Sequence, residues 1–344
     1  MRSVVAIDVT PCVGRQTGVG RYVRELVGGL AELGAAITGV YQGHHGNPEG
    51  IAIDKLSRYD LLGGYIGGRV RLQHALRSAG ARIYHATSTI AAPSSSWTGR
   101  VVATIHDCWP LTPGAGVDWR TRLLFRHLLG RILQRADMVL CPSRHAADEV
   151  RRHGWKGPLE VIPHGIRPPP RGPRRRPPAA PHEPYLLTIG AIEHRKGWDL
   201  LVDAERPLPW FHAGPVRYDR GGRIASRMSA GGCRLLGYLP EEERLDWLAH
   251  AAVVAIPSRS EGFGYPALEA MAWGVPVIAL PDGALPEVLG DAALWSQPDR
   301  IGTDVRVLLG DDKARAQLRA AGLARSAAAT IEQMARRHVE AYAR

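Results

Sequence analysis

The sequence predicts an α/β protein made of two doubly wound domains, and three observations support that class. The chain has 344 residues, more than one hydrophobic core usually organises. Short β-prone runs alternate with helical patterns in both halves, which is typical of parallel sheets covered on both faces. Between the halves, residues 166–184 hold eight prolines and five arginines, a composition that cannot fold regularly.

These observations predict the domain boundaries. We expect an N-terminal domain over 1–166, a linker over 167–183 and a second domain over 184–328. The last stretch, 329–344, is expected to form a C-terminal helix, with the first domain as a candidate packing partner. Open parallel sheets bind ligands beyond the carboxyl ends of their strands, so two such domains facing each other predict a functional cleft.

The N-terminal half begins with a strand pattern, VVAID, at residues 4–8. A glycine-bearing turn follows, and then an amphipathic helix pattern over 21–33 that Gly34 closes. Five more β-prone runs are expected to be strands of the same sheet. They are AITGVY, RIYHAT, VVATIHD, MVLCPS and LEVIPHG, in that order along the chain.

The C-terminal half repeats the alternation. Its expected strands are YLLTIGA, WFHAG, CRLLGYL, VVAIPS and PVIAL. A long stretch rich in alanine and arginine over 312–343 has a helical pattern and ends the chain.

Composition narrows the classes of protein. No apolar run approaches the roughly 20 residues that span a bilayer, and the N-terminal apolar stretch is too short for a signal peptide. The four cysteines are scattered, without a CxxC pair or the spacing of metal ligands. We therefore expect a reduced, cytoplasmic protein without a metal site.

The charge is distributed unevenly along the chain. Residues 1–180 carry 25 Lys and Arg against 12 Asp and Glu, whereas the two signs nearly balance from residue 181 onward. This asymmetry suggests that the first half meets an anionic partner: a nucleic acid, an anionic membrane surface or a phosphorylated substrate. A solvated basic surface without a specific partner explains the same counts.

One stretch, SEGFGYPALEAMAWGVPVIA at 260–279, has the form of a ligand site. Pro266 suits a first helical position and Gly274 a helix end. The amides of residues 262–265 then lie in a turn before a helix N-terminus, where free N–H groups favour phosphate or sugar oxygens. Glu261 and Glu269, one before the helix and one inside it, are suited to accept hydrogen bonds from hydroxyls.

This stretch resembles the signature of retaining GT-B glycosyltransferases of the family-four type, which use nucleotide-diphosphate sugars. Seven further blocks resemble the same family in order along nearly the whole chain. They are TGVGRYVRELVGGL, VVATIHDCWPLTP, ADMVLCPSRHAADEV, LEVIPHGI, IGAIEHRKGWDLLVDA, LLGYLPEEERLDWLAHAAVVAIPS and GALPEVLGDAALW. The resemblance implies a GT-B fold, with the acceptor in the first domain and the donor in the second.

The resemblance also assigns the donor contacts. Glu261 would contact hydroxyls of the donor sugar, and Glu269 would hold the 2′ and 3′ hydroxyls of the ribose. Backbone amides would approach the sugar and phosphate from Gly262, Phe263 and Gly264. Backbone groups of Gly237 and Tyr238 would contact the base.

Arg195 and Lys196, in EHRKG, would bind the diphosphate and stabilise negative charge on the departing nucleotide. Elementary chemistry agrees, because cations aimed at an anionic leaving group act preferentially in the transition state. Taken alone, such a pair after a strand is usually a solvated turn.

The remaining assignments fall in the first domain and near the end of the second. Gly18 and Gly20 would lie beside the donor diphosphate, and Arg21 would touch the phosphate or the acceptor. His106 would be a ligand to the donor sugar near the reacting carbon. Three residues are acceptor-side or supporting candidates: His85, Asp107 and Glu287. Packing or capping roles explain each of these residues as well.

For the reaction, the resemblance favours retention by a front-face route in which the leaving phosphate helps to deprotonate the acceptor. No DxD motif is present, so we expect a metal-independent enzyme without a cofactor. The motifs TGVGRY and IHD are most similar to those of mannosyl-type transferases, which favours GDP-mannose as donor, with UDP- and dTDP-hexoses open. The acceptor is expected to be a glycan, a lipid-linked molecule or a small molecule.

Two other functions stay open at this point. A GT-B-like sugar-nucleotide epimerase would use the same donor site. A basic nucleic-acid-binding protein would use the charged first half, although the recognised motifs and the basic-aromatic interleaving of that class are absent, so we expect no nucleic acid. The segment WRTRLLFRHLLGRIL, with Arg120, Arg122, Arg126 and Arg131, has an amphipathic pattern. It predicts either peripheral docking on the inner face of an anionic membrane or packing within its own domain.

Overall fold

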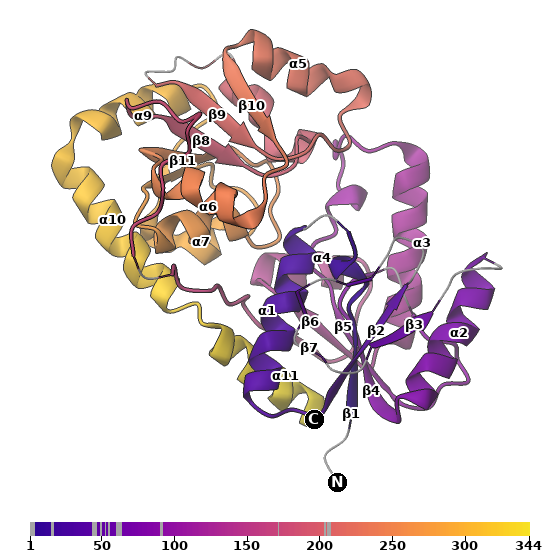
Figure 1. Cartoon of the computed structure of the whole chain (residues 1–344). Helices are drawn as coiled ribbons and strands as arrows, with labels where there is room; N and C mark the ends of the chain where they lie inside the picture. The colour runs from indigo at the N-terminus through magenta and orange to yellow at the C-terminus, as the bar shows by residue number, and fades with distance from the viewer. Residues whose placement is uncertain are drawn as a thin grey trace. The chain divides into compact units, whose positions relative to one another are not determined.

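The computed structural model describes all of the chain except residues 1–3, 15–16, 43–46, 49, 52, 54–55, 60–63, 90–91, 171, 203 and 205–207. The chain divides into two compact units. Unit 1 consists of Met1–Thr112, Asp118–Arg167 and Ala329–Arg344, and unit 2 of Pro113–Val117 and Pro168–Ala328. Both units appear in Figure 1, where the colour follows the residue number.

Unit 1 contains a seven-stranded sheet in the order β3-β2-β1-β4-β5-β6-β7, and every pairing between these strands is parallel. The strands are β1 Val4–Asp8, β2 Ile37–Gln42, β3 Leu56–Tyr59, β4 Ala81–Ala86, β5 Arg100–Thr104, β6 Met138–Cys141 and β7 Leu159–Val161. The central strands are almost wholly buried because helices cover both faces of the sheet. The strand order reverses between β1 and β4, which makes that junction the switch point of the sheet.

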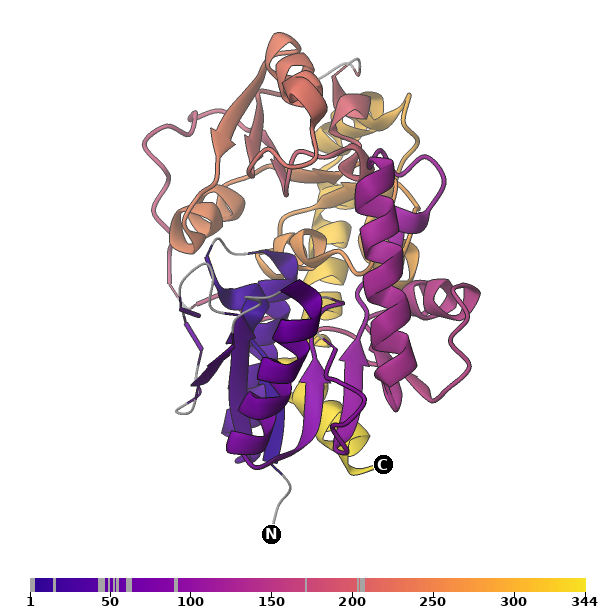
Figure 2. The ribbon, with the colours of Figure 1, turned by 90° about the vertical axis from the view of Figure 1, so that its right-hand side faces the viewer.

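The helices of unit 1 are α1 Gly18–Glu32, α2 Gly64–Ser78, α3 Trp119–Arg135, α4 Arg144–Arg152 and α11 Ile331–Ala343, with single 3₁₀ turns η1 Thr10–Cys12 and η3 Trp109–Leu111. One apolar cluster joins the sheet to α2, α3 and α4. Figure 2 shows α3 lying alongside the strands. Helix α11 packs against α1, beside which it lies in Figure 1.

The helical stretch predicted over 312–343 is two helices rather than one. It breaks after α10 (Asp312–Ala327), and α11 begins beyond Thr330, whose side chain accepts a hydrogen bond from Gln333 N at 3.1 Å. At the break the chain returns to unit 1, where Ile166 N donates to Ala329 O at 2.9 Å. The break therefore marks the point where the chain passes from unit 2 back to unit 1.

Unit 2 contains a six-stranded parallel sheet in the order β10-β9-β8-β11-β12-β13. The strands are β8 Leu186–Ile189, β9 Trp210–Ala213, β10 Cys233–Gly237, β11 Val253–Ile256, β12 Val277–Ala279 and β13 Leu294–Trp295. The α-helices are α5 Arg223–Ala230, α6 Glu241–Ala249, α7 Tyr265–Ala272, α8 Leu285–Leu289, α9 Ile301–Gly310 and α10. The 3₁₀ turns are η4 His194–Lys196, η5 Trp198–Leu201, η6 Arg220–Gly222 and η7 Gly290–Ala292.

The fold class predicted from the sequence is confirmed: both units are doubly wound α/β structures with parallel sheets. Each strand expected from a β-prone run is present. The sequence patterns missed β3 and β13, which are edge strands of their sheets. β3 has the sequence LSRY, without a continuous apolar run, and β13 has only two residues. Periodicity therefore detects neither, whereas the edge strands β7 and β10 carry apolar runs and were predicted. Among the described residues, no helix has both the length and the apolar character that crossing a bilayer requires.

Candidate functional site

The main cluster of site residues lies at the switch point of unit 2, where β8 and β11 are neighbours but their onward connections run in opposite directions. Ligands of doubly wound sheets bind beyond the carboxyl ends of the strands at such a point. The segment after β8 leads into η4 and carries Arg195 and Lys196, and the segment after β11 leads into α7 and carries Glu261.

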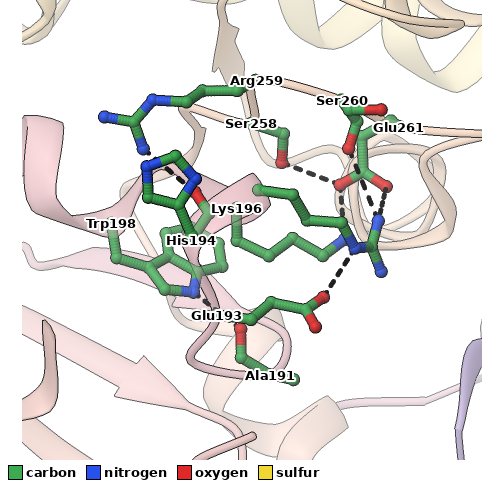
Figure 3. A network of polar contacts seen from close by, with 10 residues as sticks. Ala191, Glu193, His194, Lys196, Trp198, Ser258, Arg259, Ser260 and Glu261 are labelled. Carbon is green, nitrogen blue, oxygen red and sulfur yellow. Dashed lines mark hydrogen bonds and ion pairs between the residues drawn. The ribbon is translucent and has the colours of Figure 1, made fainter. Parts of the chain in front are cut away.

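Lys196 and Glu261 form the centre of this cluster. Lys196 Nζ donates to Glu261 Oε1 at 2.5 Å, and Ser258 Oγ donates to the same oxygen at 2.8 Å. Lys196 is 7% exposed and Glu261 6% exposed, so the ion pair lies almost wholly out of water. Figure 3 shows both side chains pointing toward each other from the two loops.

Arg195 supplies the second cation. Its Nε lies 2.7 Å from Glu193 Oε1, and its Nη1 lies 3.6 Å from Glu261 Oε2. A further contact holds the loops together, since Arg259 N donates to Arg195 O at 2.7 Å. The Arg259 guanidinium also makes a two-bond pair with Asp199, at 2.7 and 2.8 Å.

Gly197 allows the two loops to approach this closely. Its φ of 67° lies in the left-handed region, and a Cβ at this position would sit 1.9 Å from Pro257 O. Because only glycine avoids that overlap, the close packing of the loops after β8 and β11 depends on this residue.

The charges of the cluster explain the ionisation of Glu261. Burial by itself raises the pKa of this carboxyl, but Lys196 and then Arg195 act against burial, and the net pKa is lowered. Glu261 is therefore an anion at neutral pH, held between two cations. Such a carboxylate accepts hydrogen bonds from hydroxyls, and the cations beside it suit a diphosphate.

The helix after the glycine turn forms as the sequence predicted. Gly264 precedes α7 with a φ of 99°, and Pro266 lies in its first turn. The Phe263 and Tyr265 rings are both buried and stack edge to face, with centroids 5.4 Å apart. The Phe263 side chain therefore anchors the turn, so ligand contacts from Gly262, Phe263 and Gly264 would come from the backbone.

Glu269, inside α7, has a partner that the sequence analysis missed. Arg244 on α6 donates through Nη1 to Oε2 at 3.0 Å and through Nη2 to Oε1 at 2.8 Å. Glu269 is 6% exposed. The two residues are 25 positions apart on different helices, so no spacing rule links them, and only an arginine among the acids of EEERLD hinted at such a pair.

Two further donor candidates lie at the end of β10. Gly237 has a φ of 70° and is partly exposed, and Tyr238 is 40% exposed, so the segment before α6 reaches solvent. Glu287 lies on α8. From that segment it is Ala284 N that reaches the Glu261 loop, donating to Glu261 O at 2.8 Å.

The other candidates belong to unit 1. Gly18 is exposed at the start of α1, and a Cβ there would meet nothing within 4 Å. Gly20 packs against η1, where a Cβ would lie 2.4 Å from Pro11 O. Arg21 is 8% exposed. The glycine loop thus has one open position and one position required for packing.

His106 lies just beyond β5, with both ring nitrogens engaged. Its Nε2 lies 3.0 Å from Thr87 O, and its Nδ1 lies 3.2 Å from His164 Nε2. A carbonyl only accepts, so Nε2 donates and Nδ1 accepts from His164. Burial lowers the pKa of His106 to about 4, which keeps the ring neutral. Asp107, the next residue, is half-buried and acts electrostatically on Glu149.

His85 is fully buried, and its partners lie within unit 1. Its Nδ1 lies 2.7 Å from Tyr342 Oη on α11, and its Nε2 lies 2.7 Å from Thr104 Oγ1. These bonds anchor the C-terminal helix. They engage both ring nitrogens of His85, so neither nitrogen is presented to an acceptor substrate.

The same network continues through a second histidine of α11. His338 Nδ1 lies 2.8 Å from Met334 O and must donate to it, so His338 Nε2 accepts from Tyr22 Oη at 2.8 Å. Tyr22 Oη then accepts from Thr104 Oγ1 at 3.0 Å. One directed chain of hydrogen bonds therefore joins α11 to α1, β4 and β5 through neutral histidines.

Among the described residues, no group of three or more His, Cys, Asp or Glu side chains has a geometry that would hold a metal ion. The polar cluster of unit 2 is instead made of cations and carboxylates in pairs.

Comparison with protein families agrees with this geometry. Residues 16–168 match the model described as Glycosyltransferase Family 4, and residues 183–311 match the one described as Glycosyl transferases group 1. The chain therefore contains a Glycosyltransferase Family 4 domain and a Glycosyl transferases group 1 domain. Apart from residues 113–117 and 168, which belong to unit 2, the first region lies in unit 1, and the second region lies in unit 2.

Relatives of this chain include two bacterial proteins with partial matches. O-antigen chain mannosyltransferase B of Escherichia coli is 35% identical over 174 residues, covering 46% of this chain and 45% of that protein. D-inositol 3-phosphate glycosyltransferase of Jonesia denitrificans is 33% identical over 162 residues, covering 41% of this chain and 38% of that protein. The chain thus matches less than half the length of either relative.

Solved structures match along the whole chain at low identity, which supports the fold. Sucrose-phosphate synthase from Thermosynechococcus elongatus superposes with a TM-score of 0.77 at 21% identity, covering 99% of this chain and 98% of that one. Anabaena HepE, in complex with UDP and glucose, gives a TM-score of 0.76 at 13% identity and covers all of both chains.

Proposed function

We propose that this protein is a retaining glycosyltransferase that moves a hexose from a nucleotide-diphosphate sugar to a hydroxyl of its acceptor. The observation that carries the proposal is the pairing of Glu261 with Lys196 and Arg195 at the switch point of unit 2. An anionic acceptor of hydrogen bonds and two cations then lie at the place where doubly wound sheets bind nucleotides.

The three side chains bind different parts of the donor. Glu261 accepts from hydroxyls of the transferred sugar, while Lys196 and Arg195 face the diphosphate. As the glycosidic bond breaks, negative charge develops on the departing nucleotide, and cations already in place stabilise that state more than the ground state. Their electrostatic role is the one that a divalent ion fills elsewhere, so we expect transfer to proceed without a metal or other cofactor.

His106 is the proposed sugar contact from unit 1. Its neutral ring has one N–H, which Thr87 O accepts, so a contact with sugar oxygen requires that this hydrogen bond be exchanged. Gly18, Gly20 and Arg21 at the start of α1 are proposed to lie beside the diphosphate. Retention is proposed to follow the front-face route, in which a leaving-phosphate oxygen takes the proton of the acceptor hydroxyl.

For the donor we favour GDP-mannose, with UDP- and dTDP-hexoses as alternatives. A relative named as a mannosyltransferase supports mannose, and a structural neighbour in complex with UDP and glucose keeps a uridine donor open. A panel of nucleotide sugars, screened by thermal shift and then by product analysis, tests the proposal, because a ligand of the folded state raises its apparent stability. Transfer with retained anomeric configuration and full activity in EDTA is expected. Conversion of the nucleotide sugar into its epimer, without transfer, would identify an epimerase. No binding of any nucleotide sugar would refute the proposal.

The acceptor is proposed to be a glycan, a lipid-linked molecule or a small molecule, and α3 favours one presented at an anionic membrane surface. The outward face of α3 exposes three large apolar side chains: Trp119, Leu123 and Leu124 are 69%, 60% and 46% exposed. Arg120 and Arg126 are exposed beside them. An apolar strip edged by arginines is the form of a helix that lies in a lipid interface.

The sequence proposal for this helix needs one refinement. Arg122 and Arg131 are half-buried, while Leu129 and Ile132 pack into the core. One side of α3 therefore packs within unit 1, and the opposite side is the proposed docking face.

Liposome flotation tests the docking face. The protein is expected to float with vesicles containing phosphatidylglycerol and not with phosphatidylcholine alone, and Leu123→Asp is expected to weaken that binding at least tenfold. Val307→Asp is the matched control, because Val307 is 64% exposed on α9 of unit 2. Equal binding to both vesicle types, or an unchanged Leu123→Asp, would refute membrane docking.

A further inference from the structure

The carboxylate proposed to hold the ribose is not alone in this structure. Both oxygens of Glu269 accept from the terminal nitrogens of Arg244, at 3.0 and 2.8 Å. The Arg244 side chain is 16% exposed and that of Glu269 7%, so this ion pair lies mostly out of water. The pair joins α6 to α7, the helices that follow the proposed base-binding and sugar-binding loops.

An ionised carboxylate at this depth needs a compensating cation, because burying an unpaired charge is strongly unfavourable. Arg244 supplies a compensating cation. A ribose diol is neutral, so it cannot replace the charge of the guanidinium. If Arg244 swung away when the nucleotide bound, a buried anion would face hydroxyls alone.

A carboxylate can accept hydrogen bonds from more than one partner, because its two oxygens offer about four lone-pair sites. The pair with Arg244 engages each oxygen once. A ribose diol therefore need not displace the guanidinium in order to reach the carboxylate. The planar guanidinium also fixes the carboxylate plane, which a single-point cation would leave free to rotate.

We propose that Arg244 is a positioning residue for nucleotide recognition: it stays paired with Glu269 and holds that carboxylate, ionised and oriented, for the ribose hydroxyls. This inference rests on the proposed function, since it assumes that Glu269 binds ribose. It adds a residue on α6 to the donor site and makes recognition of the ribose depend on a helix that precedes α7 in the chain.

The test compares nucleotides with and without the ribose hydroxyls. Dissociation constants are measured by calorimetry for GDP and UDP, and the tighter ligand is then compared with its 2′,3′-dideoxy form. Wild-type protein is expected to prefer the ribonucleotide by at least tenfold. Arg244→Met is expected to lose most of that preference by weakening the ribonucleotide alone, and Arg244→Lys to keep part of it, because lysine restores the charge without the fixed plane.

Arg174, in the segment between β7 and β8, offers a matched control that is bound to the same helix. It pairs with Glu242 at 2.7 Å and Asp246 at 2.9 Å, so Arg174→Met removes an arginine bound to α6 without touching Glu269. Its preference for the ribonucleotide is expected to equal that of wild type. A structural defect of α6 would lower the melting temperature and weaken both nucleotides together, whereas a positioning role changes their ratio.

The outcomes separate the inference from the proposed function. If wild type binds neither GDP nor UDP, the proposed function fails, and the inference with it. If wild type prefers the ribonucleotide but Arg244→Met keeps or increases that preference in a folded protein, only the inference fails. An increased affinity would show that Arg244 competes with the ribose instead of preparing its site.

Discussion

Acidification should destabilise unit 1 well above the pH at which most carboxylates titrate. Burial lowers the pKa of His338 and of His106 to about 4, and lowers those of His85 and His164 as well. An unfolded histidine has a pKa near 6.5. Between pH 6.5 and 4 the unfolded chain therefore binds more protons than the folded unit, so stability falls as the pH falls through that window.

The magnitude follows from these values. Lowering the pH from 7.5 to 5 costs about 2 kcal/mol for a histidine whose pKa drops from about 6.5 to about 4 on folding. His106 and His338 together give about 4 kcal/mol. Asp8 acts in the opposite sense, because burial raises its pKa to about 6 and the folded unit then takes up a proton first. Asp8 offsets about 1 kcal/mol, so the net loss from these three groups is about 3 kcal/mol, and His85 and His164 add to it.

Denaturation by guanidinium chloride at pH 7.5 and 5.0, followed by hydrogen exchange in peptides of α1 and α11, measures this loss for unit 1. His338→Gln should reduce the pH-dependent loss by about 2 kcal/mol, since glutamine forms hydrogen bonds without titrating. His127→Gln is the control, because His127 is exposed on α3 of the same unit. Equal stability of unit 1 at the two pH values, or a full pH dependence in His338→Gln, would refute the reasoning.

Two further predictions concern unit 2. Glu269→Ala should raise the KM for the donor at least tenfold. Lys196→Ala should mainly lower kcat, by about 10²–10³-fold, because its cation acts on charge that develops in the transition state. Steady-state kinetics with the preferred donor separates these effects, and unchanged constants in both variants would contradict the site. Gly197→Ala should lower the stability of unit 2 by about 3 kcal/mol or more, since its Cβ would overlap Pro257 O. Thermal unfolding measures that loss, with Gly221→Ala as control: its φ of 68° is nearly the same, but its Cβ would meet nothing within 4 Å, and equal effects of both substitutions would show that overlap is not the cause.

Much of the fold followed from local patterns. Continuous apolar runs such as 253–256 and the capped helix of 265–272 reflect the burial of central strands and the geometry of helix ends, which depend on neighbours in sequence. The edge strands β3 and β13 did not follow, because LSRY has no continuous apolar run, LW has only two residues, and both depend on pairing with one neighbouring strand.

The candidate site likewise had a part that the sequence predicted and a part that it did not. The motifs around Lys196 and Glu261 were readable, and the packing of their loops places the two side chains 2.5 Å apart although they are 65 positions apart in the chain. The partner of Glu269 was not readable, because Arg244 lies on another helix. The buried setting of His85 depends on Tyr342, a residue 257 positions away.

By itself, then, the amino-acid sequence determined the α/β class, the presence of two parallel-sheet domains and the charged groups of the candidate site. These properties depend on periodicity, composition and short motifs, which each segment carries alone. Only the tertiary structure decided which charges pair, which histidines are neutral and which arginine accompanies Glu269. Ion pairing and desolvation act over a few ångströms, and that proximity arises when segments far apart in the chain pack together.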